Sequence, residues 1–143
     1  MVRGSDLRNG CAISCGCLRE SIIAYDLKKY SEKKYESINE YKILKSKKTG
    51  KYLPFDIYIP SIKLFVEING QQHYYISGWT KLKAKSLGKS PKKLFLEQTK
   101  RDEIKKNYAK SNGSYLEINL VKIKTIKKAI EILDRKVESI LIK

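Results

Sequence analysis

The sequence predicts one α/β domain, a mixed β-sheet flanked by helices, with the element order α-β-β-β-α-β-α. Two observations lead to this prediction. Apolar residues recur at helical spacing near both ends of the chain, and β-branched and aromatic runs lie between them. The length of 143 residues is sufficient for one hydrophobic core. We expect the domain to span residues 18–143, after an irregular cysteine-containing arm at residues 1–17.

The first helix is predicted over residues 18–30, where apolar side chains recur at the i, i+4, i+7 spacing of one helix face: Ile23, Leu27 and Tyr30. A second row with the same spacing widens that face: Leu18, Ile22 and Tyr25. Residues 31–34 predict a polar turn, and residues 35–44 a strand. The lysine-rich segment 45–51 suits a hairpin loop that could also touch phosphates.

A hairpin is predicted next, from two strand-like runs, Phe55–Ile59 and Ile62–Ile68, on either side of Pro60-Ser61. Gly70 ends the second run. Residues 74–90 show little periodicity and predict a loop with at most a short helical turn.

The C-terminal part predicts a helix, a strand and a second helix. Ser90-Pro91 reads as an N-cap followed by proline at the first helical position, and this helix should run to residue 109 or 110. Asn112-Gly113 predicts a left-handed cap at its end. Along residues 114–120, aliphatic side chains alternate with polar or aromatic ones, which predicts a strand. Thr125 then begins a helix to Lys143 with an apolar stripe: Ile126, Ala129, Ile130, Leu133, Val137, Ile140 and Leu141.

The net charge of +16, from 31 Lys and Arg against 15 Asp and Glu, favours a polyanion as partner. A lysine-rich, AT-biased genome would produce part of the same excess. Residues 81–110 hold eleven Lys or Arg and three acids, which favours a surface that follows phosphates over a plain solvated helix face. The candidate DNA contacts are Lys81, Lys83, Lys85, Lys92, Lys93, Arg101, Lys105 and Lys106.

Nothing in the sequence indicates a membrane anchor or a secretion signal. It contains no apolar run of membrane-spanning length, no signal-peptide core and no convincing basic amphipathic anchor. We therefore expect a soluble protein of the cytoplasm. Three clustered cysteines, Cys11, Cys15 and Cys17, argue against a disulfide framework and leave open either free thiols or metal ligation. A structural zinc needs four ligands, and no fourth is near Cys15 and Cys17.

The predicted hairpin carries the candidate site. Asp56 lies near the start of its first strand and Glu67 near the end of its second, and His73, the single histidine, follows Gly70. Taken singly, each residue is more often a solvated acid or an ordinary histidine. Together, strand-borne carboxylates beside an imidazole predict a metal-dependent hydrolytic site, since carboxylate oxygens suit Mg²⁺ and histidine transfers protons near neutral pH.

Four features, in this order, resemble the PD-(D/E)XK nuclease superfamily, in the branch of the very-short-patch repair endonuclease and its homing-endonuclease relatives. They are Glu20 on the first helix, Phe55-Asp56, the run Glu67-Ile68-Asn69-Gly70-Gln71-Gln72-His73, and Asp102-Glu103-Ile104-Lys105. The resemblance covers about residues 18 to 120 and implies a restriction-endonuclease-like fold. The superfamily lysine position is Asn69 here.

The resemblance implies that Asp56 and Glu67 bind Mg²⁺, for which Mn²⁺ could substitute, that His73 acts near the scissile phosphate, and that Glu20 completes the site. Lys105 could pair with Asp102 or contact phosphate. The N-terminal arm resembles the back half of a zinc ribbon found beside phage homing endonucleases, through Gly4–Gly10 and Ser14–Leu18, so that a Zn²⁺ site at Cys15 and Cys17 would be incomplete.

The resemblance therefore implies a phage-type homing endonuclease that hydrolyses double-stranded DNA in a bacterial or phage-infected cell, with a homodimer or two successive nicks needed to cut both strands. The alternatives are a mismatch-nicking repair nuclease and a catalytically inactive DNA-binding module. An RNA-binding protein is disfavoured, because the acids would repel phosphate without a metal.

Overall fold

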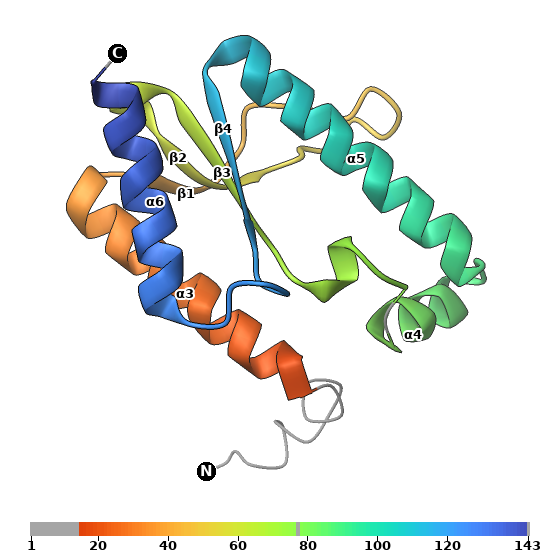
Figure 1. Cartoon of the computed structure of the whole chain (residues 1–143). Coiled ribbons are helices and arrows are strands. Elements are labelled where there is room, and N and C mark those ends of the chain that lie inside the picture. Colours follow the sequence, from red (N-terminus) through yellow and green to blue (C-terminus); the bar gives the residue numbers. More distant parts are fainter. Residues whose placement is uncertain (1–14, 77, 143) are drawn as a thin grey trace.

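The computed structural model describes residues 15–76 and 78–142, and it is an α/β fold with a four-stranded mixed sheet flanked by helices (Figure 1). The elements are α3 (Cys15–Tyr35), β1 (Ile38–Tyr41), β2 (Phe55–Ile59), β3 (Leu64–Asn69), α4 (Gly78–Leu87), α5 (Pro91–Asn112), β4 (Ser114–Asn119) and α6 (Ile126–Leu141), with 3₁₀ turns η1 (Pro60–Ile62) and η2 (Gln71–His73). The mixed α/β class is confirmed. The predicted order omitted one helix, α4.

The sheet has the strand order β1-β2-β3-β4, in which β1, β2 and β3 are antiparallel neighbours and β4 runs parallel to β3. A parallel pair needs a long crossover connection, and α4 and α5 form it. The chain therefore leaves the C-terminal end of β3, passes through both helices, and returns in β4 beside β3.

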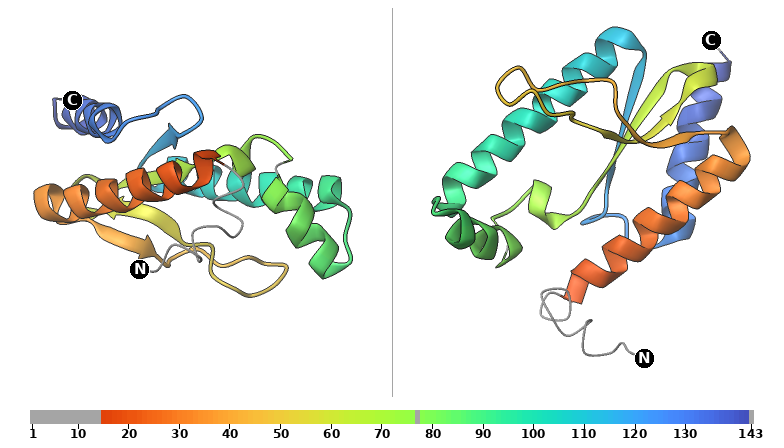
Figure 2. Two further views of the ribbon diagram at one scale, coloured as in Figure 1. Left: turned by 90° about the horizontal axis from the view of Figure 1, so that it is seen from below. Right: turned by 180° about the vertical axis from the view of Figure 1, so that it is seen from behind.

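Helices α3 and α6 lie together on one side of the strands and α5 on the other (Figure 2), and an apolar cluster lies on each side. The larger one joins α3 and α6 to the strands: Ile23, Leu27, Ile57, Ile59, Leu64, Val66, Ile118, Leu120, Ala129, Leu133 and Val137. The smaller one lies under α5 and contains Phe55, Phe65 and Ala109, with tyrosines packed around it. The α5 face is therefore aromatic near β1 and polar toward the ends of β3 and β4.

Helix α3 is longer than predicted. The polar segment 31–34 continues the helix, and Ser31 is fully buried. The second apolar row does not join the core, because Leu18, Ile22 and Tyr25 are all exposed. Since α3 begins at Cys15, Glu20 lies beyond its first turn. Residues 1–14 of the predicted arm lie outside the described residues.

The segment predicted as a loop contains α4, a ten-residue helix. Lysines alternate with other residues along 81–85, so the local pattern has a period of two and hides the helix. Ala84 and Thr80 are buried, and α4 packs against α5 (Figure 1). Tertiary packing thus decides the secondary structure of this segment.

The helix starts predicted in the C-terminal half are confirmed. The Ser90 hydroxyl accepts a hydrogen bond from the Lys93 backbone at 3.1 Å, and the Thr125 hydroxyl accepts one from Lys128 at 3.2 Å. The predicted left-handed cap is wrong, because Gly113 is extended, with φ of 166°. The stripe on α6 ends before Leu141, which is exposed, and Lys143 lies outside the described residues. None of the helices described could span a membrane.

Candidate functional site

The candidate site lies where strands β2 and β3 separate. Their direct pairing runs from Ile59↔Leu64 to Ile57↔Val66 and is not continued by backbone pairs beyond that point. Strand β2 remains paired with β1 as far as Phe55, whereas β3 remains paired with β4 as far as Asn69. Asp56 and Glu67 occupy the first positions after the strands part. We call this place, defined by Asp56 and Glu67, the strand fork.

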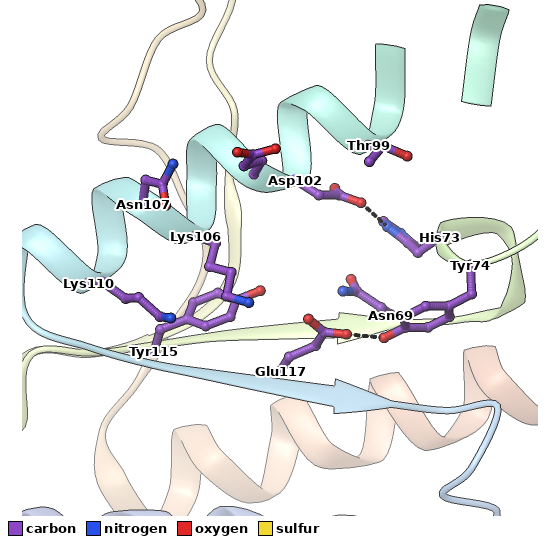
Figure 3. Close-up of a pocket in the computed structure, with 11 residues that line it drawn as sticks. Asn69, His73, Tyr74, Thr99, Asp102, Lys106, Asn107, Lys110, Tyr115 and Glu117 are labelled. Atoms are coloured by element: carbon purple, nitrogen blue, oxygen red, sulfur yellow. Dashed lines mark hydrogen bonds and ion pairs between the residues drawn. The ribbon is translucent and has the colours of Figure 1, made fainter. Parts of the chain in front are cut away.

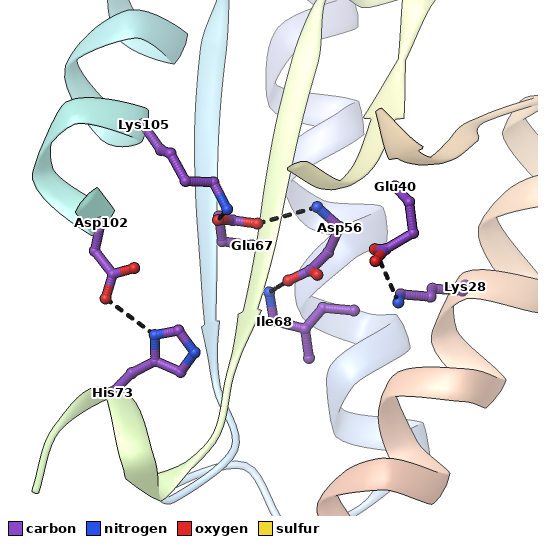
Figure 4. A network of polar contacts seen from close by, with 8 residues as sticks. All are labelled: Lys28, Glu40, Asp56, Glu67, Ile68, His73, Asp102 and Lys105. Atoms are coloured by element: carbon purple, nitrogen blue, oxygen red, sulfur yellow. Dashed lines mark hydrogen bonds and ion pairs between the residues drawn. The ribbon is translucent and has the colours of Figure 1, made fainter. Parts of the chain in front are cut away.

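The two carboxylates bridge the strand fork through the backbone (Figure 4). The Asp56 N–H donates to Glu67 Oε2 at 3.0 Å, and the Ile68 N–H donates to Asp56 Oδ2 at 2.7 Å. These bonds satisfy backbone donors that a continuous ladder would otherwise pair. Each acid is therefore fixed by the opposite strand, and both are brought to one point, as the sequence predicts.

Glu67 is buried, with 4% of its surface exposed, and it forms an ion pair with Lys105 of α5. Burial raises the pKa of Glu67 to about 8, the nearby charge of Asp56 adds to that rise, and Lys105 opposes it. From the sequence, Lys105 had two candidate partners, the Asp102 carboxylate and a phosphate of the bound nucleic acid. The structure instead places its ammonium group at the strand fork.

The strand fork suits a hard divalent cation. Two carboxylates with mutually unfavourable charges lie together there, and a cation between them would relieve that repulsion. Among the described residues, no three His, Cys, Asp or Glu side chains are grouped to hold a metal. Mg²⁺ usually retains several waters and needs only one or two protein carboxylates, so Asp56 and Glu67 fit Mg²⁺.

His73 and Asp102 form a second polar pair beside the strand fork. The imidazole Nδ1 lies 3.0 Å from Asp102 Oδ2, which joins the turn after β3 to α5 (Figure 4). Both side chains are partly buried, at 21% and 29% exposed. The carboxylate fixes the ring orientation, and the second ring nitrogen points away from Asp102.

His73 and Asp102 lie at the rim of a cavity of about 480 Å³ between α5 and the ends of β3 and β4 (Figure 3). Inside it, the Tyr74 hydroxyl donates to the Glu117 carboxylate, and Asn69 lies beside Tyr74. Burial and the Glu117 charge raise the pKa of Tyr74. Asn69, at the position where the superfamily has lysine, is thus a buried amide within this network.

Glu20 lies at the end of β3. Its Oε2 accepts a hydrogen bond from the Gln71 N–H at 3.3 Å, and a Cβ on Gly70 would overlap its other oxygen. The glycine therefore allows the α3 carboxylate to approach the turn that carries His73. The hydrogen bond described for Glu20 supports that turn and makes no direct link to Asp56 or Glu67.

The candidate DNA contacts lie on α4 and α5, and most are exposed: Lys81, Lys83, Lys85, Lys92, Lys93 and Lys106. Arg101 is partly exposed, and Lys105 is turned inward to Glu67. Lys106 and Lys110 line the cavity. The incomplete Zn²⁺ site expected at Cys15 and Cys17 stays a prediction. Cys11 lies outside the described residues, and Cys15 and Cys17 fall in the first turn of α3.

Sequence reasoning missed the contribution of β4 to this site. Tyr115 and Glu117 line the cavity, and Glu117 lies directly beside Glu67 in the parallel register. The alternation of residues 114–120 indicates that Tyr115 and Glu117 share a face. That alternation carries no information on the neighbouring strand, so the cluster becomes visible only in the folded chain.

No known protein family, curated protein or solved structure matches this chain at a significant level. The features of the chain that bear on its function are the strand fork, the cavity and the basic helices α4 and α5.

Proposed function

We propose that this chain is a Mg²⁺-dependent endonuclease that hydrolyses phosphodiester bonds in double-stranded DNA. The observation that carries the proposal is the strand fork, where Asp56 and Glu67 from separate strands are held together with Lys105 opposite them. A buried carboxylate beside a second, partly buried one is costly to fold around, and function gives a reason to retain the pair. Mg²⁺ held there would offset the negative charge that develops on the phosphate oxygens and activate the attacking water.

His73 is the proton-transfer residue in this proposal, and Asp102 is its positioning residue. The 3.0 Å contact at Nδ1 leaves the other ring nitrogen to accept a proton from the attacking water or to donate one to the leaving oxygen. Glu20 holds the turn that carries the histidine through its bond to Gln71.

The basic surface of α4 and α5 would bind the DNA backbone. Exposed lysines follow both helices, and two more lysines line the cavity beside His73. Each phosphate contact would release a counterion, so binding should weaken steeply with salt. This surface and the strand fork adjoin the same helix, α5, which would bring a bound phosphate toward the carboxylates.

Asn69 supports the inactive DNA-binding module as the second candidate. The amide cannot supply the positive charge of the superfamily lysine, and its side chain lies beside Tyr74 in the cavity. A protein that binds DNA without cleaving it in Mg²⁺ or in Mn²⁺ would fit that candidate.

Within the endonuclease proposal, the resemblance of the sequence favours a phage-type homing endonuclease over a mismatch-nicking repair enzyme. Cleavage of a matched duplex at a defined position would support the former, and strong preference for a mismatched duplex the latter. Double-strand cutting by one strand fork per chain would require a homodimer or two successive nicks.

The test is incubation of the purified protein with supercoiled plasmid, with Mg²⁺ and with a chelator. We expect relaxed or linear product only with Mg²⁺. Asp56→Asn should abolish cleavage and retain DNA binding, whereas Asp26→Asn, a matched change at an exposed position on α3, should cleave as the wild type does. Full activity of Asp56→Asn would refute the assigned site.

A further inference from the structure

Lys105 occupies a position that DNA binding does not explain. It extends from α5 to the Glu67 carboxylate (Figure 4). Its Nζ lies 5.4 Å from the centroid of the Phe55 ring. Only 14% of its side chain is exposed, and 5% of that of Glu67. The ammonium group is therefore enclosed between helix, aromatic ring and strand fork, unlike its exposed neighbour Lys106.

Stability does not explain the pair either. Taking an ammonium group out of water is unfavourable, and its attraction to a carboxylate seldom exceeds that loss. Apolar side chains of similar volume commonly stabilise a protein as well as a buried ion pair does. A charged residue at this position is better explained by the chemistry of the strand fork.

Phosphodiester hydrolysis needs positive charge at the non-bridging oxygens, where negative charge builds up in the transition state. Asn69, on the same strand as Glu67, is neutral and lies beside Tyr74. Among the described residues, Lys105 is the cation that forms an ion pair with Glu67, and it comes from α5, 38 positions along the chain.

We propose that Lys105 is a catalytic residue that contacts the scissile phosphate and stabilises its developing charge. This inference rests on the proposed endonuclease function. When Glu67 is ionised, its carboxylate holds the ammonium group in place. Once the charge of Glu67 is neutralised by another cation, the ammonium group is released toward the phosphate. Lysine forms no covalent bond in this role.

The first experiment separates turnover from DNA affinity in the full chain with Mg²⁺. Lys105→Met keeps the apolar stem and removes the charge, so it should lower kcat by about 10²- to 10³-fold with little change in KM. Lys105→Arg should retain part of the activity. Lys106→Met, next to it but exposed and lining the cavity, should instead raise KM and leave kcat unchanged. Lys127→Met, on α6, should leave both unchanged.

The second experiment measures DNA affinity without any metal, so that it does not depend on cleavage. With Glu67 intact, Lys105 is engaged, and Lys105→Met should change the dissociation constant little. With Glu67→Gln, the ammonium group is freed. Lys105→Met in that background should weaken binding by about tenfold, the worth of one charged contact. Melting temperatures of all four proteins establish that each one folds.

The kcat, KM and DNA affinity of the Lys105→Met variants can each overturn the inference. If the wild type cleaves and Lys105→Met reaches the same kcat, the inference is overturned and the endonuclease proposal stands. A raised KM at unchanged kcat would reduce Lys105 to a binding residue and also overturns it. An equal loss of affinity in both Glu67 backgrounds contradicts the release of the ammonium group. If the wild type cleaves nothing with Mg²⁺ or Mn²⁺, the endonuclease proposal fails first, and the catalytic role of Lys105 fails with it.

Discussion

The Asp56 N–H donates to the Glu67 carboxylate across the strand fork at 3.0 Å, while the Asp56 carboxylate accepts from Ile68 at 2.7 Å. Each acid thus replaces part of the hydrogen-bond ladder that ends at Ile57 and Val66. The same contacts hold the two negative charges close together. Local structure and the proposed chemistry therefore depend on the same atoms.

Glu67 should make stability depend on pH. Its pKa rises from 4.5 to about 8 on folding, so the folded state holds a proton that the unfolded state has lost between these values. Stability should therefore fall as pH rises through this window. We expect the melting temperature of the wild type to fall relative to that of Glu67→Gln as pH rises from 4.5 to 8. Parallel curves would contradict the buried carboxylate.

Mg²⁺ should reverse that loss. A cation that binds the ionised carboxylates competes with the proton, so the rise in melting temperature on adding Mg²⁺ should grow with pH in the wild type. Glu67→Gln should show little rise at any pH. Glu138→Gln, an exposed change on α6, serves as the matched control and should respond as the wild type does.

His73→Ala should lower kcat by about 10²- to 10⁴-fold, the usual contribution of a proton-transfer group. Asp102→Asn should lower it less, because the ring keeps a hydrogen-bond partner at Nδ1 but loses the charge that orients it. The double variant should be no slower than His73→Ala, since Asp102 acts only through the histidine. Additive losses would assign Asp102 a separate role.

How far the sequence predicts this fold depends on whether local pattern and tertiary packing agree. They agree at Phe55–Ile59, whose bounds as a strand are confirmed, and at Ser90, whose capping bond is observed. They disagree at α4, where lysines impose a period of two on a helix that is held by α5. They also disagree at Ser31, a polar residue that packing buries.

The candidate site follows the same rule. Asp56, Glu67 and His73 stand in one short run, so their proximity could be predicted from the hairpin alone. Lys105 could not be assigned to Glu67, because the crossover that brings α5 over β3 includes the helix that the local pattern concealed. Glu117 reaches Glu67 only through the parallel pairing of β3 and β4.

Gly113 should be required for the crossover to close. A Cβ at this position would overlap the backbone carbonyl of Lys63, to which the next residue, Ser114, donates a hydrogen bond at 2.9 Å. Backbone cannot move aside as a side chain can. We expect Gly113→Ala to lower the free energy of unfolding by about 1–3 kcal/mol in chemical denaturation. Gly78→Ala should be neutral, because a Cβ at that position would meet nothing within 4 Å.

Asp134 should stabilise the opposite face of the sheet through three partners. Tyr30 donates to it at 2.7 Å, Tyr35 also donates to it, and the Lys34 ammonium lies 3.4 Å away. Partial burial alone would raise the pKa of Asp134, but the tyrosine hydrogen bonds and the lysine charge outweigh it and lower the pKa. A carboxyl group with a lowered pKa adds stability above its unfolded pKa and loses it as pH falls through the folded pKa.

Asp134→Asn should therefore lower the free energy of unfolding at neutral pH by about 1–3 kcal/mol, the range for hydrogen bonds to a charged group. The difference from the wild type should shrink as the solution is acidified below the ordinary range of aspartate, because the wild-type carboxylate is then protonated as well. Urea denaturation at neutral and acidic pH measures both effects. A difference that stays constant with pH would show that Asp134 acts through packing and not through its charge.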